Sequence, residues 1–246
     1  VDSVSVEGMP QGMPPVGQGS NLPELFESWK IDFSSDEVVA DAQLALQVSG
    51  MDRRPVRHYG IIGITEDLMS PDDIITAELN VVNLSTAGSL RKLEDSAIDF
   101  QPLLYSSTFS QTMAATQFSF LPDPSTLQTS FVPDDTQYVL AARISGTLKT
   151  AFPNGAPPDR NNNSAGLTKE HLSETIGISN LIIVADVDML ADHLWVQVQS
   201  FFGQQIANPF ANNGAFVINA LENLSGNADL IGVRSRASYT RPFIRV

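Results

Sequence analysis

The chain has 246 residues, of which 42% are hydrophobic and 17% charged, a composition typical of a globular protein with a sizeable core. Acidic residues outnumber basic ones by 28 to 14, and the resulting net charge of −14 repels the phosphate backbone, so we expect no nucleic-acid partner. The absence of cysteine excludes disulfides, thiolate metal sites and cysteine nucleophiles, and no apolar run approaches the ~18 residues of a membrane-spanning helix.

Residues 1–20 are rich in glycine, proline and methionine and show no periodicity, so we predict an extended arm or linker there. We expect the remainder, 21–246, to form a single domain. Its first element is a predicted helix with Asn21 as the N-cap and Glu24 placed for a capping box. Four apolar residues of this segment share one helix face: Leu22, Leu25, Phe26 and Trp29.

The middle of the chain is rich in strand-forming residues and is broken by turns. The alternation over 39–48 favours a strand, although a helix is also compatible with it. Four further runs of β-branched and aromatic residues predict strands over 60–65, 79–85, 100–107 and 137–148. The segment between the last two is polar and interrupted by prolines, which favours a surface excursion. A mobile loop is predicted over 153–166, because its prolines, glycines and asparagines leave nothing to bury.

The last third alternates strand and helix patterns. Leu181 to Ala185 form a continuous apolar run, as expected of a strand covered on both faces. A helical stripe follows, made of Leu190, Leu194, Val198 and Phe201. A second helix is predicted with Asn213 as N-cap, Gly226 as its stop, and a buried face of Val217, Ala220, Leu221 and Leu224.

A strand over 229–235 completes a strand–helix–helix–strand order for about 178–236. Alternating strands and helices predict an α/β fold with a largely parallel sheet and flanking helices, to which the β-rich middle region is joined.

Three carboxylates, Asp186, Asp188 and Asp192, follow the apolar strand-like run. An Asp-x-Asp at a strand end opens the haloacid-dehalogenase-type motif, which continues with threonine or valine and needs a later lysine. Here Met189 and Leu190 follow the two aspartates, and the rest of the chain contains no lysine. Structural roles are the stronger interpretation: Asp188 would cap the next helix, and Asp186 would bond main-chain amides in the turn. A Mg²⁺ or Ca²⁺ site made by the three carboxylates stays open as an alternative, since both ions prefer oxygen ligands.

Other candidate sites carry less chemistry. The three histidines share no metal-ligand spacing, and the chain has no nucleotide-binding or nucleophile-elbow motif, so we expect no cofactor. Asn212 and Asn213 begin the second helix and would line any solute pocket beside Asp186, where ligands of α/β sheets usually sit. The C-terminal tail is basic, with Arg234, Arg236, Arg241 and Arg245. It favours a solvated edge strand, and the alternative is a surface that docks on an acidic partner or an anionic membrane.

The C-terminal third resembles a known family. The residues that carry the resemblance are the A-D-x-D strand end, W-V-Q-V, N-N-G, N-A-L-E-N-L-S-G and L-I-x-V-R-S-R, and earlier segments such as NLPELFESWKIDF and AARISGTLKTAFP follow in the same order. The chain is similar, from about Asn21 to its end, to the auxiliary, substrate-binding-like component of an uncharacterized ABC transport system, a group that includes the gliding-motility GldG-type proteins.

This resemblance implies a flavodoxin- or glutamine-amidotransferase-like α/β domain on the extracytoplasmic (periplasmic) side of the bacterial inner membrane. It also implies partners, an ABC permease and ATPase, and membrane anchoring by segments outside this chain, which would be part of a longer protein. We therefore expect a non-catalytic accessory domain that binds partner proteins of the transporter. The alternatives are a solute-binding domain and a metal-dependent hydrolase using Asp186 and Asp188.

Overall fold

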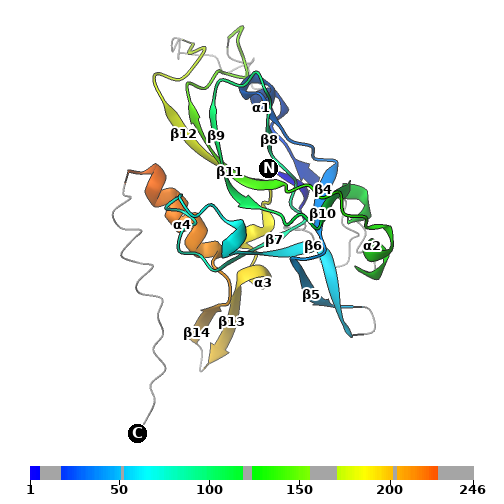
Figure 1. Cartoon of the computed structure of the whole chain (residues 1–246). Coiled ribbons are helices and arrows are strands. Elements are labelled where there is room, and N and C mark those ends of the chain that lie inside the picture. Colours follow the sequence, from blue (N-terminus) through cyan, green and yellow to red (C-terminus); the bar gives the residue numbers. More distant parts are fainter. Residues whose placement is uncertain (6–17, 51–52, 119–123, 156–170, 202–203, 227–246) are drawn as a thin grey trace, which may run out of the picture.

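A computed structural model describes residues 1–5, 18–50, 53–118, 124–155, 171–201 and 204–226, and their sheets are small (Figure 1). Every strand pair among the described residues is antiparallel, in sheets of two or three strands. The prediction of a largely parallel sheet with flanking helices, flavodoxin- or glutamine-amidotransferase-like, is therefore wrong. Parallel neighbours need long crossover connections, usually helical, whereas three of the four described α-helices have seven residues or fewer.

The N-terminal part of the chain forms short strands and one helix. The two-stranded pairs are β1 (Asp2–Ser5) with β2 (Gln18–Ser20), and β3 (Ile31–Asp32) with β8 (Arg91–Lys92). The predicted first helix is confirmed as α1 (Pro23–Trp29), with Phe26 buried, although Leu22 and not Asn21 occupies the cap position. Residues 6–17 of the predicted arm lie outside the described residues.

The alternating segment 39–48 is two strands rather than one. β4 (Glu37–Asp41) pairs with β10 (Ser110–Ala114), and β5 (Ala45–Ser49) pairs with β6 (Pro55–Thr65). The break comes from Asp41, whose Oδ1 accepts hydrogen bonds from the N–H groups of Gln43 (2.8 Å) and Leu44 (2.9 Å). A side chain that binds the main chain two and three residues ahead makes a tight turn.

Two three-stranded sheets contain the four strands predicted in the middle of the chain. One has the order β5-β6-β7, with β7 at Val81–Ser85, and the other the order β12-β11-β9. In the second, β9 (Asp99–Tyr105) and β12 (Ser179–Val184) flank β11 (Val139–Gly146). The predicted strand over 181–185 is confirmed, but as a half-buried edge strand, so the expectation of cover on both faces is wrong.

The predicted surface excursion between β9 and β11 contributes to the core instead. It contains β10, a 3-10 turn η2 (Ala115–Gln117) and the helix α2 (Pro124–Ser130). A separate 3-10 turn, η1 (Glu66–Leu68), lies outside this segment and follows β6. Apolar residues spaced among its polar ones pack against β4: Met113, Ala115, Phe118 and Leu127 meet Val38 and Ala40. These apolar residues stand singly among polar ones and show no strand or helix period. The polar composition of the segment therefore led to the wrong prediction of a surface excursion.

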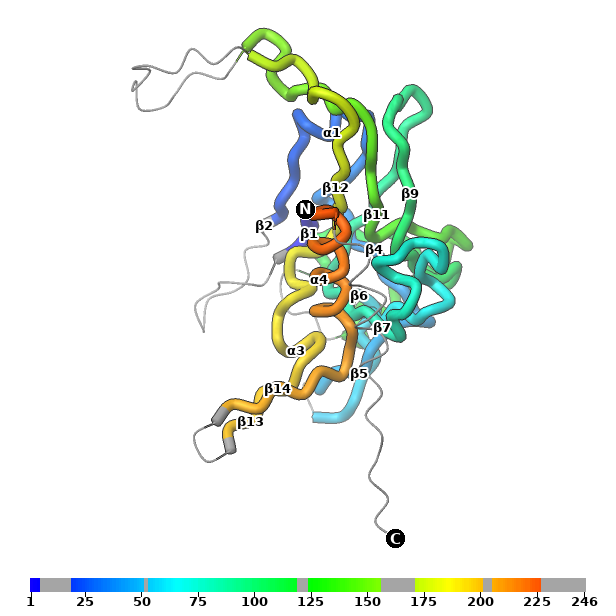
Figure 2. Tube along the Cα trace, turned by 90° about the vertical axis from the view of Figure 1, so that its left-hand side faces the viewer, coloured from blue at the N-terminus to red at the C-terminus, as the bar shows by residue number. Residues whose placement is uncertain are grey.

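After β12, the chain departs most from prediction. A 3-10 turn η3 (Asp188–Leu190) and a one-turn helix α3 (Asp192–Trp195) lead into a hairpin of β13 (Val196–Phe201) and β14 (Gln204–Pro209). The predicted helix past Trp195 is wrong, because V-Q-V-Q alternates with the period of a strand and finds a partner in β14. The hairpin projects from the body of the molecule (Figure 2).

The final described helix is confirmed as α4 (Asn213–Leu224), but Asn212 and not the predicted Asn213 occupies the cap position. Its buried face differs from the prediction: Asn213, Phe216 and Ala220 are buried, whereas Leu221 and Leu224 are exposed. Phe216 and Ala220 join the largest apolar cluster, which lies among β6, β7, β9 and β11. Among the described residues, no helix has the length and apolar character of a membrane span.

Candidate functional site

Three buried aspartates meet where β12 ends. Asp186 and Asp188 follow β12, and Asp2 reaches them from β1 at the start of the chain. One carboxylate oxygen from each lies within 4.8 Å of the other two, and the residues are 0% (Asp2), 3% (Asp186) and 0% (Asp188) exposed. We call these residues the three-aspartate cluster.

Contacts of β1 with the body of the protein hold Asp2 in this position. The hydroxyl of Thr86 donates to the carbonyl oxygen of Val4 (2.7 Å), and the amino group of Val1 donates to the carbonyl oxygen of Val184 (3.3 Å). Val4 itself is buried against β4 in a separate apolar cluster. The start of the chain is thus fastened to the loop after β7 and to the last residue of β12.

Main-chain amides donate hydrogen bonds to two carboxylates of the cluster. Asp186 accepts from the N–H of Asp188 at Oδ1 (2.7 Å) and from the N–H of Ser85 at Oδ2 (2.7 Å), which confirms the predicted role of Asp186 in the turn. Asp2 accepts from the N–H of Val4 at Oδ1 (3.2 Å), whereas its Oδ2 is buried without a hydrogen-bond partner.

Burial dominates the electrostatics of the cluster. It raises the pKa of Asp186 to about 8 and that of Asp2 to about 7, because a carboxylate loses its hydration in the interior. The neighbouring carboxylates raise both values further, and the main-chain donors lower them only in part.

Two expectations for the aspartates are not met. Asp188 is not the N-cap of a helix, because η3 begins at Asp188 itself and its cap position belongs to Val187. Asp192 does not join the carboxylate cluster; it is exposed in the first turn of α3. Asp2 takes its place, and no sequence pattern could have revealed this, since 184 residues separate Asp2 from Asp186.

Asn212, the cap residue of α4, binds the free edge of β7. Its side-chain oxygen accepts hydrogen bonds from the N–H groups of Asn80 (3.0 Å) and Val81 (3.1 Å). Its own N–H donates to the carbonyl oxygen of Val81 (2.7 Å). The residue therefore continues the strand edge as a neighbouring strand would.

Asn213 repeats this arrangement two residues further along β7. Its Oδ1 accepts from the N–H of Asn83 (3.0 Å), and its Nδ2 donates to the carbonyl oxygens of Asn83 (2.7 Å) and Met189 (2.6 Å). Asp186 then binds the N–H of Ser85, so side chains satisfy the outward-facing groups of β7 at every second residue. We call this row, Asn212, Asn213 and Asp186, the polar seam.

The polar seam occupies the place predicted for a solute pocket. The amide groups of Asn212 and Asn213 bind the main chain, and Asn213 is fully buried, so these groups fasten α4 to β7. The predicted basic residues Arg234, Arg236 and Arg241 lie outside the described residues.

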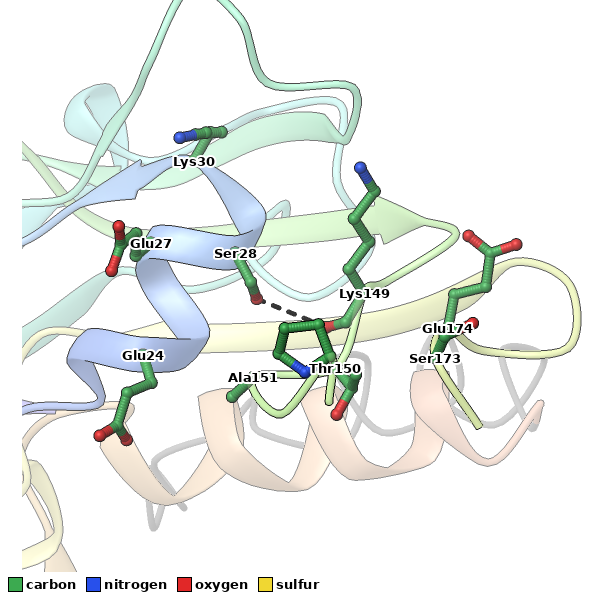
Figure 3. Close-up of a pocket in the computed structure, with 10 residues that line it drawn as sticks. Glu24, Glu27, Ser28, Lys30, Lys149, Thr150, Ala151, Ser173 and Glu174 are labelled. Atoms are coloured by element: carbon green, nitrogen blue, oxygen red, sulfur yellow. Dashed lines mark hydrogen bonds between the residues drawn. The ribbon is translucent and has the colours of Figure 1, made fainter. Parts of the chain in front are cut away.

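A surface cavity of about 600 Å³ lies elsewhere, between α1 and the segments that follow β11 and precede β12 (Figure 3). Its rim carries charges of both signs, including Glu24, Glu27, Lys149 and Glu174. The carbonyl oxygen of Lys149, one of the lining residues, accepts a hydrogen bond from the indole Nε1 of Trp29 (2.9 Å). Small-molecule pockets are lined predominantly by hydrophobic and aromatic side chains, whereas five of the ten residues that line this hollow are charged.

Comparison with known proteins gives one family. Residues 1–220 match the sequence profile of a family described as an ABC-type uncharacterized transport system. The comparison with curated proteins and the comparison with solved structures found no match.

Proposed function

Because the chain belongs to this family of ABC-type transport auxiliary proteins, we propose that it is a non-catalytic accessory domain that binds partner proteins of its transporter on the extracytoplasmic side of the bacterial inner membrane. The family match carries the role in an ABC transport system, since it covers residues 1–220 of 246. Binding to partner proteins and location on the extracytoplasmic side go beyond the family match and are proposed here.

The exposed side of α4 supports a protein partner. Ile218, Leu221 and Leu224 are 46%, 63% and 41% exposed and recur every third residue, so they form one apolar stripe. Phe210, which leads into the helix, is also exposed. Contiguous exposed apolar side chains mark interaction surfaces in soluble domains, and the occupant we propose is the ABC permease.

The basic tail extends this proposal. Arg234, Arg236 and Arg241 follow α4 in the sequence and concentrate positive charge on a chain with a net charge of −14. Such a cluster complements an acidic permease surface or anionic lipid headgroups and would steer the domain toward them.

Co-purification of the full-length, membrane-embedded protein with its permease tests the proposal. We expect the double variant Ile218→Ser/Leu221→Ser to lose the permease, and reversal of Arg234, Arg236 and Arg241 to glutamate to weaken its retention. Val132→Ser is the matched control, because Val132 is an exposed apolar residue outside α4. Retention of the permease by both the serine and the glutamate variants would refute partner binding through this end of the chain.

The location has its own test. The chain has no cysteine, so Val132→Cys introduces a single exposed thiol into this domain. A membrane-impermeant maleimide should label this thiol in cells whose inner membrane is intact. Labelling only after that membrane is broken would contradict the extracytoplasmic location.

A metal-dependent hydrolase is the rival proposal, and the burial of its candidate residues disfavours it. A catalytic ion keeps an open position that a substrate can reach, whereas Asp186 and Asp188 are almost completely buried. Phosphatase turnover with Mg²⁺ that disappears in Asp186→Asn, in a variant that melts like the original protein, would establish the hydrolase instead.

A further inference from the structure

We propose that Asp2, Asp186 and Asp188 bind a divalent cation, Ca²⁺, which fastens the first strand of the domain to the end of β12. One oxygen from each carboxylate lies within 4.8 Å of the others. Ca²⁺ binds oxygen at about 2.3–2.6 Å, so two of its ligands are at most ~4.6–5.2 Å apart, and the cluster satisfies this limit. Mg²⁺ binds oxygen at about 2.0–2.1 Å, so its ligands must lie within ~4.2 Å of each other. This limit is tighter than the 4.8 Å within which the three oxygens lie, so Ca²⁺ is the ion that we propose.

The second observation is the buried oxygen that has no hydrogen-bond partner. Main-chain donors occupy Oδ1 of Asp2 and both oxygens of Asp186, but Oδ2 of Asp2 has no partner although the residue is 0% exposed. A buried acceptor without a partner is costly, so proteins rarely retain one. A cation among the three carboxylates binds this oxygen as one of its ligands and so gives it a partner.

The charges around the cluster lead to the same conclusion. Three carboxylates that share one buried space repel each other and lose their hydration together. A divalent ion offsets most of that charge at the point where the three side chains converge.

The ion would join parts of the chain that are far apart in sequence. Asp2 and Asp186 are separated by 184 residues, and β1 has only the three-residue β2 as its strand partner among the described residues. Because the ion binds the folded arrangement and not the separated strands, its binding free energy stabilises the docked position of β1.

The test uses the purified chain, stripped with EDTA and titrated with CaCl₂. Calorimetry should show one site per chain, and at ~100-fold excess over Kd the melting temperature should rise by roughly 5–10 °C. Asp2→Asn and Asp188→Asn should remove both signals. Asp192→Asn is the matched control, since Asp192 is close in sequence but exposed and outside the cluster, and it should bind like the original chain.

Several outcomes would overturn the proposal. These are no heat and no shift in melting temperature at millimolar Ca²⁺, unchanged binding by Asp2→Asn, or stronger stabilisation by Mg²⁺ than by Ca²⁺. The asparagine variants keep the size of the side chain, and circular dichroism at low temperature checks that they are folded. The experiment involves no transporter subunit, so its result is independent of whether the domain binds a permease.

Discussion

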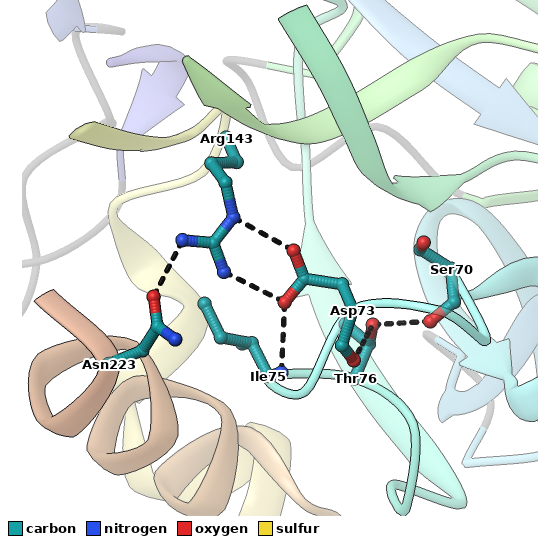
Figure 4. Close-up of polar contacts among 6 residues, drawn as sticks. All are labelled: Ser70, Asp73, Ile75, Thr76, Arg143 and Asn223. Atoms are coloured by element: carbon teal, nitrogen blue, oxygen red, sulfur yellow. Dashed lines mark hydrogen bonds and ion pairs between the residues drawn. The ribbon is translucent and has the colours of Figure 1, made fainter. Parts of the chain in front are cut away.

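Two of the places where the described part of the chain buries carboxylates compensate them differently. Asp73 accepts from Nε and Nη2 of Arg143, each at 2.8 Å, and from the N–H of Ile75 (2.9 Å), while Arg143 also donates to Asn223 of α4 (2.6 Å) (Figure 4). In the three-aspartate cluster, main-chain N–H groups donate to Asp186 and to Asp2.

The comparison teaches that hydrogen bonds and countercharge are separate requirements of a buried acid. Arg143 meets both for Asp73 through a bidentate contact and thereby links β11 to α4. Main-chain amides meet the first requirement for Asp186, yet burial still raises its pKa to about 8. Arg143 therefore supplies the countercharge of Asp73, whereas burial favours a bound proton or a bound cation at Asp186.

The largest effect is expected from breaking the complete pair. Arg143→Met leaves Asp73 buried without its countercharge and should lower the free energy of unfolding by about 3–5 kcal/mol, measured by urea denaturation. Arg91→Met is the control, because its partner Asp32 is exposed and such pairs contribute about 0–1 kcal/mol. Equal losses in both variants would show that burial does not distinguish these pairs.

An uncharged buried contact separates hydrogen bonding from charge. Asn213→Ala removes one acceptor and two donor contacts and leaves main-chain groups of Asn83 and Met189 without partners. We expect a loss of about 2–4 kcal/mol, also measured by denaturation, with no change in its pH dependence. Asn219→Ala, which removes a single bond to the carbonyl oxygen of Ile75, should cost less than half of that.

The cluster should make stability depend on pH when divalent cations are removed with EDTA. The unfolded chain releases the Asp186 proton near pH 3.8, whereas the folded chain holds it to about pH 8, so the folded state binds more protons between these values. This contribution is therefore fully present below about pH 4 and is lost as the pH rises through about 8. We expect a decrease of roughly 2–3 kcal/mol from pH 5 to pH 8.

Asp186→Asn checks this assignment, because asparagine does not titrate. Melting temperatures of the variant should change much less between pH 5 and pH 8 than those of the original chain. A pH profile identical to that of the original chain would assign the dependence to other groups.

The smallest effect on stability is expected at the exposed stripe of α4. Leu221 is 63% exposed, so Leu221→Ser should change the free energy of unfolding by no more than about 0.5 kcal/mol. Phe216→Ser on the opposite, buried side should unfold the domain or nearly so. Severe destabilisation by Leu221→Ser would show that this side chain is part of the core and would remove the support for a docking surface.

Local patterns predicted most of the individual elements. β-branched runs identified β6, β7, β9, β11 and β12, and helix patterns identified α1 and α4, because these depend on spacing within a few residues. V-Q-V-Q after Trp195 carried a strand signal that the longer helical stripe of leucines and phenylalanine obscured. The buried face of α4 was misplaced, because several rotations of an apolar helix satisfy the same spacing.

The sequence by itself determined where most of the strands and helices form, that Asp186 would bind the turn after its strand, and to which family the chain belongs. Only the tertiary structure decided that the sheets are antiparallel, that side chains of Asn212 and Asn213 complete the edge of β7, and that Asp2 joins Asp186 and Asp188. The reason is physical: backbone propensity acts over a few residues, whereas strand pairing and the compensation of buried charge depend on groups that can be far apart in sequence, such as Ser110 beside Asp41 and Asp2 beside Asp186.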